Sequence, residues 1–107
     1  MAVKIRSKRP DPALRKISLA LEQYAAVHPH AEIEIYRQNS VSIRLRVLDP
    51  EFKGKSRVQR EDELWAILDA LTEELVSEIS LVLLLTPDES KKSFANFEFD
   101  NPIPSKL

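Results

Sequence analysis

The spacing of hydrophobic residues changes several times along the chain, and each spacing predicts an element. Asp11 and Pro12 form a typical helix start, because the carboxylate accepts from free backbone N–H groups and Pro fits the first turn. Apolar residues then recur every three or four positions, at Leu14, Ile17, Leu21 and Tyr24 or Ala25. This period predicts an amphipathic helix that ends near Val27, since Pro29 disfavours helical geometry at His28.

Residues 31–48 alternate apolar and polar side chains in two successive runs. Alternation with a period of two is typical of strands buried on one face, so we predict a β-hairpin. The apolar faces consist of Ile33 and Ile35 in the first run and of Val41, Ile43, Leu45 and Val47 in the second. A two-residue turn at Asn39-Ser40 would set Ile35 opposite Arg44, whereas a three-residue loop, Gln38 to Ser40, keeps apolar residues together.

The three-residue loop also predicts the cross-strand pairs. They are Ile35 with Ile43, Ile33 with Leu45, Glu34 with Arg44 and Glu32 with Arg46. Each of the two opposite-charge pairs would contribute a few tenths of a kcal/mol to about 1 kcal/mol. Arg44 and Arg46 are therefore expected to be neutralised locally, which argues against a nucleic-acid-binding stripe on this face.

The segment after the hairpin begins with a turn around the only glycine of the chain. Gly54 permits a positive φ or a close backbone contact there. Ser56, followed three residues later by Gln59, has the form of a capping box and predicts a helix start. The inward side of this helix is assigned to Val58, Leu64 or Trp65, Leu68 and Leu71. Thr72 predicts a second cap, with a short helix over residues 73–78 behind it.

Residues 79–86, I-S-L-V-L-L-L-T, form a nearly continuous apolar run. Its length and lack of alternation favour a strand buried on both faces or at the centre of a sheet over a helix, since the run is short and ends at Pro87. Joined to the hairpin by helices, this strand should run parallel to one hairpin strand through a right-handed crossover. The predicted order is α-β-β-α-α-β, an α+β fold with a three-stranded mixed sheet and helices on one face.

Composition restricts the class of protein. The chain has 107 residues of which 43% are hydrophobic, enough for one domain with one core. Sixteen basic and seventeen acidic residues leave no overall field that would hold a polyanion. Cysteine is absent, which excludes disulfides and thiolate chemistry. Because no apolar run is long enough for a signal peptide or a membrane span, we expect a cytoplasmic protein without membrane contact.

We divide the chain into a basic N-terminal arm (1–10), a domain (11–88) and a Phe-rich C-terminal tail (89–107). For so short an arm, a frayed and solvated terminus is a simpler interpretation than phosphate contact. The tail contains Phe94, Phe97 and Phe99. Phe97 and Phe99 alternate as in an extended segment. We expect the tail to fold back over its own core; alternatively it offers a short strand or a pocket-filling peptide to a partner.

Several anchors between residues 14 and 89 resemble the BolA family, whose fold is similar to the type II KH module. The matching positions are Phe52-x-Gly54-Lys55-Ser56, Val58-x-Arg60, Leu64-Trp65, Leu68, Glu73-Glu74-Leu75 and Leu85-Thr86-Pro87-x-Glu89. The resemblance implies a non-enzymatic module that shares an iron–sulfur cluster with a monothiol glutaredoxin. However, Glu61 stands where the family has its ligand His, and the predicted hairpin loop lacks the second ligand. We therefore predict that cluster ligation is lost and that no cofactor is bound.

Other chemistry is not indicated by the residue pattern. No nucleophile–base pair, phosphate loop or dinucleotide fingerprint is recognisable, which argues against an enzyme. His28-Pro29-His30 is the only His pair. Because no third or fourth ligand is suggested nearby, we interpret it as a solvated loop and predict no metal site.

The leading hypothesis is an interaction or regulatory module that acts through protein contacts. Its candidate contact residues are Lys53, Gly54, Lys55, Arg57 and Arg60 at the turn and helix start, or Phe94, Phe97 and Phe99 of the tail. The alternative is a nucleic-acid-binding module in which the same basic residues and the arm contact phosphates. The G-x-x-G loop of RNA-clamping KH domains is impossible in a chain with one glycine.

Overall fold

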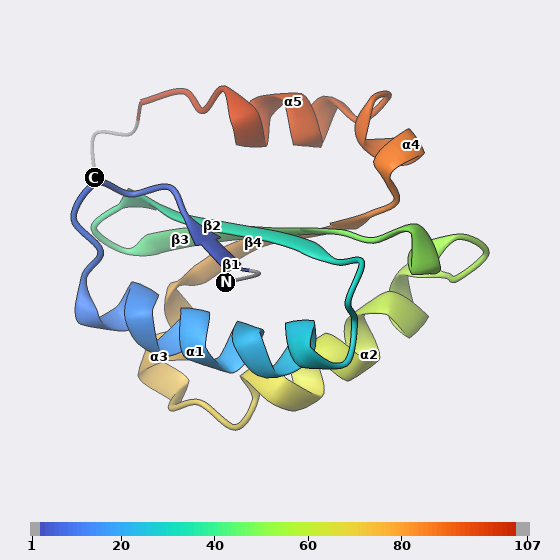
Figure 1. Ribbon diagram of the computed structural model, residues 1–107. Helices are drawn as coiled ribbons and strands as arrows, with labels where there is room; N and C mark the ends of the chain where they lie inside the picture. Colours follow the sequence, from blue (N-terminus) through green and yellow to red (C-terminus); the bar gives the residue numbers. More distant parts are fainter. Residues whose placement is uncertain (1–2, 105–107) are drawn as a thin grey trace.

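The computed structural model of the chain describes residues 3–104. Its elements are β1 (Val3–Ile5), α1 (Pro12–Ala26), β2 (Glu32–Asn39), β3 (Ser42–Leu48), the 3₁₀ helix η1 (Pro50–Phe52), α2 (Arg57–Leu68), α3 (Glu73–Glu78), β4 (Ile79–Leu85), α4 (Pro87–Ser90) and α5 (Phe94–Asp100). The fold is α+β, and the run from α1 to β4 has the predicted order. One strand precedes this run and two helices follow it (Figure 1).

The four strands form one mixed sheet in the order β1-β2-β3-β4. β1 is parallel to β2, β2 is antiparallel to β3, and β4 is parallel to β3 as predicted. The predicted number of three strands was wrong, because Val3–Ile5 pairs with β2 instead of fraying. Residues 79–86 were predicted to be buried on both faces or at the centre of the sheet. β4 instead forms the edge opposite β1, and most of its residues are half-buried. Pairing with β2 satisfies the backbone groups on one side of β1. Three residues are too few to show a hydrophobic period in the sequence.

Helices cover both faces of the sheet, not one face as predicted. In Figure 1, α1, α2 and α3 lie below the sheet, and α4 and α5 lie above it. The main core lies between the sheet and the lower layer, and its fully buried side chains include Leu14, Ile17, Leu21, Ile33, Ile35, Ile43, Leu45, Val47, Leu64 and Leu68. Burial of this continuous apolar surface is the largest stabilising contribution to the fold.

The hairpin register differs from the prediction by two residues. Ile35 lies opposite Leu45, and Glu34 lies opposite Arg46. The chain reverses after Asn39, which pairs with Ser42, and the ladder is irregular between residues 37 and 39. A shift of two residues keeps every side chain on its predicted face. Parity of the pattern therefore predicted the buried face of Ile33, Ile35, Ile43, Leu45 and Val47 correctly, but it could not distinguish two registers of equal parity. Val41, also predicted to be buried, lies in the turn and is exposed.

Local capping signals agree with the helix starts. The Asp11 carboxylate accepts from the backbone N–H of Leu14 at 2.9 Å, and Ser56 forms the predicted capping box with Gln59. Gly54 has a φ of 80°, as expected for the turn before α2. Val58 was predicted to face inward but is exposed, as are its neighbours Arg57 and Gln59, whereas Arg60 is half-buried. The first fully buried residue of the helix is Leu64.

The tail folds back onto the upper face of the sheet, as expected, but as a helix instead of an extended segment. The Ser93 hydroxyl caps α5 by accepting from the backbone N–H of Asn96. Phe99 is fully buried, and its ring packs edge-on against Tyr36 with centroids 4.8 Å apart. Phe94 and Phe97 are exposed. Only one of the three tail phenylalanines therefore holds α5 against the sheet.

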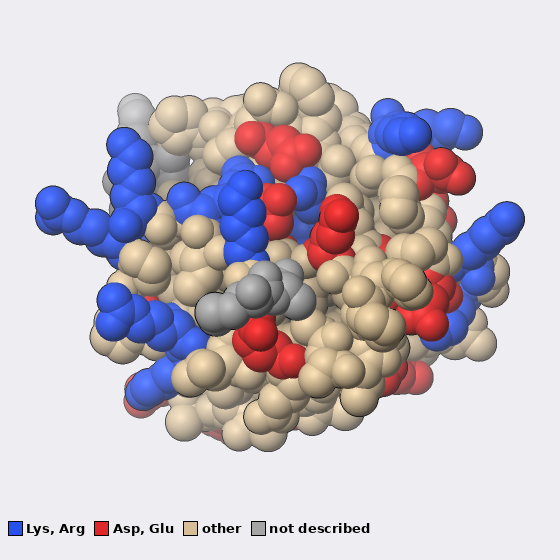
Figure 2. All heavy atoms as spheres, in the orientation of Figure 1, with Lys and Arg blue, Asp and Glu red and all other residues tan. Residues whose placement is uncertain are grey.

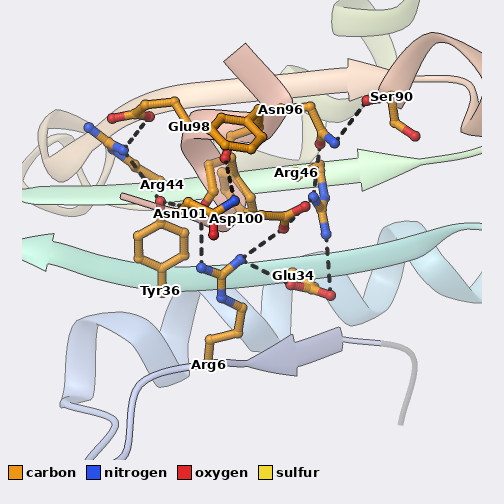
Figure 3. A network of polar contacts seen from close by, with 12 residues as sticks. Arg6, Glu34, Tyr36, Arg44, Arg46, Ser90, Asn96, Glu98, Asp100 and Asn101 are labelled. Carbon is orange, nitrogen blue, oxygen red and sulfur yellow. Dashed lines mark hydrogen bonds and ion pairs between the residues drawn. The ribbon is translucent and has the colours of Figure 1, made fainter. Parts of the chain in front are cut away.

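Charged side chains form the rest of the contact between α5 and the sheet (Figure 3). Arg46 donates to Asn96 and Asp100, both at 2.8 Å, and pairs with Glu34 at 3.3 Å. Arg44 pairs with Glu98 of α5 at 2.7 Å. The predicted neutralisation of Arg44 and Arg46 is therefore present, but α5 provides part of it. Both predicted cross-strand pairs, Glu34 with Arg44 and Glu32 with Arg46, were wrong, because Glu34 lies opposite Arg46 and Glu32 opposite Leu48.

Candidate interaction groove

The free edge of β4 borders a groove of about 710 Å³. One wall is formed by the start of α2, with Arg57 and Arg60, and the other by residues 89–95 of α4 and the following loop into α5. The floor is the apolar side of β4, where Leu81, Leu83 and Leu85 are half-buried. These leucines lie on the same face of the sheet as α5, because Leu81 pairs with Arg44 and Leu83 with Arg46.

The backbone of β4 is open toward this groove. Among residues 3–104, β4 has a neighbouring strand on one side only. The C=O of Leu85 accepts from the N–H of Asp49 at the end of β3, which places the backbone groups of Leu85 on the paired side. Because backbone groups alternate between the two sides of a strand, those of Val82 and Leu84 face the groove. Arg60 donates to the C=O of Leu84 at 3.0 Å, consistent with this alternation.

Arg60 is a structural link between the walls of the groove. Its guanidinium donates to both carboxylate oxygens of Glu89, at 2.6 and 3.1 Å, and to the C=O of Lys55 at 3.1 Å. The hydrogen bonds from Arg60, followed by those from Thr86, lower the pKa of Glu89 to about 2. Bidentate Arg–carboxylate pairs are geometrically specific. The guanidinium of Arg60 is therefore bonded to acceptors within the fold, and its charge is not free to bind a ligand.

The other predicted contact residues of the turn meet at the same end of the molecule. Lys53 and Gly54 line a second hollow of about 360 Å³, together with Pro50 and residues 86–89. Lys55 and Arg57 line the main groove. Arg57 pairs with Glu61 at 3.0 Å, but its side chain is 85% exposed and such pairs contribute little to stability. The turn thus presents several cations at the groove rim.

Sequence reasoning missed the floor and the far rim of this groove. Leu81, Leu83 and Leu85 were assigned to the interior, and Lys92 was not singled out, although it lines the groove opposite the turn. A continuous apolar run is the same whether a strand lies at the centre or at the edge of a sheet. No local signal in the chain distinguishes these positions, because the number of neighbouring strands depends on distant segments.

The remaining candidate residues lie elsewhere. Phe99 is buried beneath α5, so only Phe94 and Phe97 of the tail could contact a partner. The solvated-loop interpretation of residues 28–30 holds for His30, which is exposed, but not for His28. The ring of His28 stacks on Tyr24, with centroids 4.1 Å apart.

The basic residues of the N-terminal arm lie far from the turn. In Figure 1 the loop between β1 and α1 is at the left of the molecule, whereas the loop between η1 and α2 is at the right. Figure 2 shows Lys and Arg side chains projecting at both ends, with acidic side chains between them. The arm and the turn therefore do not form one continuous basic surface.

Comparison of the chain with protein-family models, curated proteins and solved structures found no match in any of the three. Within residues 3–104, no helix combines the length and the apolar character needed to cross a membrane.

Proposed function

We propose that this chain is a non-enzymatic interaction module that binds an extended segment of a partner protein along the free edge of β4. The observation that carries the proposal is that, among residues 3–104, the edge of β4 beside an apolar groove of about 710 Å³ has no neighbouring strand. Exposed edges of this kind accept an added strand, in which backbone hydrogen bonds provide affinity and alternate side chains enter pockets. Natural proteins usually protect exposed strand edges, so an unprotected edge favours a role in binding a partner.

The charges around the groove favour an acidic partner segment. Glu89 is paired with Arg60, and Glu61 with Arg57. In the part of the chain that the structure describes, Lys55 and Lys92 form no ion pair, although they lie on opposite rims. A bound segment with apolar residues at alternate positions and carboxylates at its ends would match both the leucine floor and this rim. Charge complementarity of this kind accelerates association and selects partners.

The BolA resemblance supports the same class of function. The order of elements from α1 to β4, the positive φ of Gly54 and the capping box at Ser56 agree with the expectations drawn from the sequence. A monothiol glutaredoxin is therefore one defined protein to test as a partner. Glu61, at the position of the family's ligand His, is paired with Arg57, and we propose that binding does not require an iron–sulfur cluster.

Nucleic-acid binding is the alternative, favoured by the exposed cations Lys53, Lys55 and Arg57 at the start of α2. Two observations place it second. Arg60 is committed to Glu89, and the basic arm lies at the opposite end of the molecule from the turn. The number of phosphates that this end could contact is correspondingly small, and affinity for nucleic acid depends on that number.

The test is selection of peptides from a random phage-displayed library on the full chain, followed by affinity measurement with synthetic peptides. We expect enriched peptides to alternate apolar residues and to carry Asp or Glu. Val82→Pro removes an N–H that faces the groove without removing a bond to β3, so it should weaken binding about tenfold while the protein stays folded. Lys55→Glu with Lys92→Glu should slow association.

Lys16→Glu, an exposed charge reversal on α1, is the matched control and should bind like the unchanged chain. If the Val82→Pro variant bound the selected peptides as tightly as the unchanged chain does, strand addition at β4 would be contradicted. A labelled single-stranded oligonucleotide provides the comparison: binding whose logarithm falls linearly with the logarithm of salt concentration would favour the alternative function. No retention of the oligonucleotide at low salt would exclude that alternative.

A further inference from the structure

A second site is present around His28, in the loop between α1 and β2. The His28 side chain is 13% exposed, and its ring lies against Tyr24 of α1. Three carboxylates from other segments face the ring: Asp49 follows β3, Glu51 belongs to η1, and Glu63 belongs to α2. Residues distant in sequence thus converge on one imidazole.

The two nitrogens of the ring face different partners. Nε2 lies 2.8 Å from both carboxylate oxygens of Glu63, which is a short and well-placed hydrogen bond. Nδ1 lies 3.5 Å from Oε2 of Glu51 and 3.8 Å from Oδ2 of Asp49. A carboxylate that accepts from Nε2–H favours the tautomer whose Nδ1 carries a lone pair. That lone pair then faces two further carboxylates, an arrangement that a cation would stabilise.

Asp49 provides an independent reason for a cation. This residue is completely buried, and its Oδ1 accepts from the N–H of Glu51 at 2.9 Å. Among residues 3–104, its Oδ2 is buried without a hydrogen-bond donor, and it is directed toward His28. A buried carboxylate oxygen without a donor is strongly destabilising.

The spacing of the three ligand atoms suits a metal ion. One ligand atom from each of His28, Asp49 and Glu51 can be chosen so that all lie within 4.8 Å of one another. Two ligand atoms, each about 2.1 Å from a tetrahedral metal, are about 3.4 Å apart. The distances of 3.5 and 3.8 Å from Nδ1 are close to this value. Metal-bound His residues also commonly donate their other N–H to a carboxylate, which is the position of Glu63.

We propose that Nδ1 of His28 and the carboxylates of Asp49 and Glu51 bind a divalent transition metal, with Glu63 as a positioning residue that holds the imidazole. One imidazole and two carboxylates suit Zn²⁺ and other borderline divalent ions better than Mg²⁺, which prefers oxygen ligands and water. The ion would join the end of α1 to the segment after β3. This proposal does not depend on the groove or its partner.

The test is calorimetric titration of the chelator-treated full chain with Zn²⁺. We expect one binding site, which His28→Gln abolishes and Glu63→Gln weakens about 10- to 100-fold. Glu51→Gln is the ligand variant of choice, because this side chain is 52% exposed and its replacement should leave the fold intact. Circular dichroism checks folding of each variant. His30→Gln, two residues from His28 and exposed, is the matched control and should bind like the unchanged chain.

Nitrogen-15 NMR of the imidazole provides a second readout. Zn²⁺ should shift the Nδ1 resonance of His28, while Nε2 remains protonated and bonded to Glu63. Absence of Zn²⁺ binding by the unchanged chain would overturn the proposal. Binding that persists in the folded His28→Gln and Glu51→Gln variants, or that His30→Gln removes, would overturn it as well.

Discussion

At the scale of single residues, Phe97 and Phe99 are identical side chains on the same helix that contribute differently to its packing. Phe99 is fully buried beneath α5, with the guanidinium of Arg46 4.7 Å and that of Arg6 5.0 Å from its ring centroid. Phe97 is 64% exposed. Cations over an aromatic face add to the energy of apolar burial. Phe99 is therefore the anchor of α5, and Phe97 contributes little to the fold.

Replacement of Phe99 by Ala should lower the free energy of unfolding by about 3–5 kcal/mol, because it leaves a cavity between α5 and the sheet. Urea denaturation followed by circular dichroism measures this change. Phe97→Ala is the matched control on the same helix and should change the free energy of unfolding by less than about 0.5 kcal/mol. Equal effects of the two substitutions would contradict the packing described for α5.

At the scale of elements, the Arg60–Glu89 pair joins α2 to α4 across the end of β4. Glu89 also accepts from the backbone N–H of Thr86 at 2.9 Å and so completes the capping box of α4. One carboxylate therefore orients the wall of the groove and begins the helix that leads to α5. Its ionised form is stabilised in the folded state, which couples this junction to pH.

Glu89 should make folding more favourable above its ordinary pKa of 4.5, and this contribution should be lost as pH falls toward the folded-state pKa of about 2. Because the side chain is 44% exposed, solvent screening limits the effect to about 1 kcal/mol. Glu89→Gln should lower the free energy of unfolding at pH 7, and the difference from the unchanged chain should shrink between pH 4.5 and 2. Asp88→Asn, at an exposed neighbouring position, is the control and should change the free energy of unfolding at pH 7 less than Glu89→Gln does.

At the scale of the whole molecule, the sheet couples two helical layers. Arg6 before α1 donates to the C=O of Phe99 at 3.0 Å, and the Tyr36 hydroxyl of β2 donates to the same oxygen at 2.9 Å. The segment after α4 is thus bonded to strands whose other face forms the main core. Loss of the upper layer would remove Asn96 and Asp100 from Arg46 and the ring of Phe99 from Tyr36.

Truncation after Lys92 should therefore destabilise the entire domain. We expect the free energy of unfolding to fall by at least the about 3–5 kcal/mol associated with Phe99. Trp65 on α2 lies in the lower layer, so its fluorescence reports whether the loss crosses the sheet. We expect the fluorescence of Trp65 to report unfolding of the truncated chain at a lower denaturant concentration than unfolding of the full chain. If truncation left the unfolding transition of Trp65 unchanged, α5 would not contribute to the stability of the rest of the domain.

The sequence by itself determined the features that depend on neighbouring residues. Asp11, Ser56 and Thr72 predict helix starts because a capping side chain bonds to its own helix. Gly54 predicts a turn because glycine adopts positive φ without strain. Alternation predicts the buried side chains of each hairpin strand, and the fold confirms them except at Val41, which is exposed.

Only the tertiary structure decided the features that depend on distant segments. Whether β4 lies at an edge depends on how many strands pair beside it, and the pairing of Val3–Ile5 depends on β2. The three carboxylates around His28 come from segments at least 21 positions away, as the difference between 28 and 49 shows. Such contacts form when the whole core is buried, so no spacing within a short window records them.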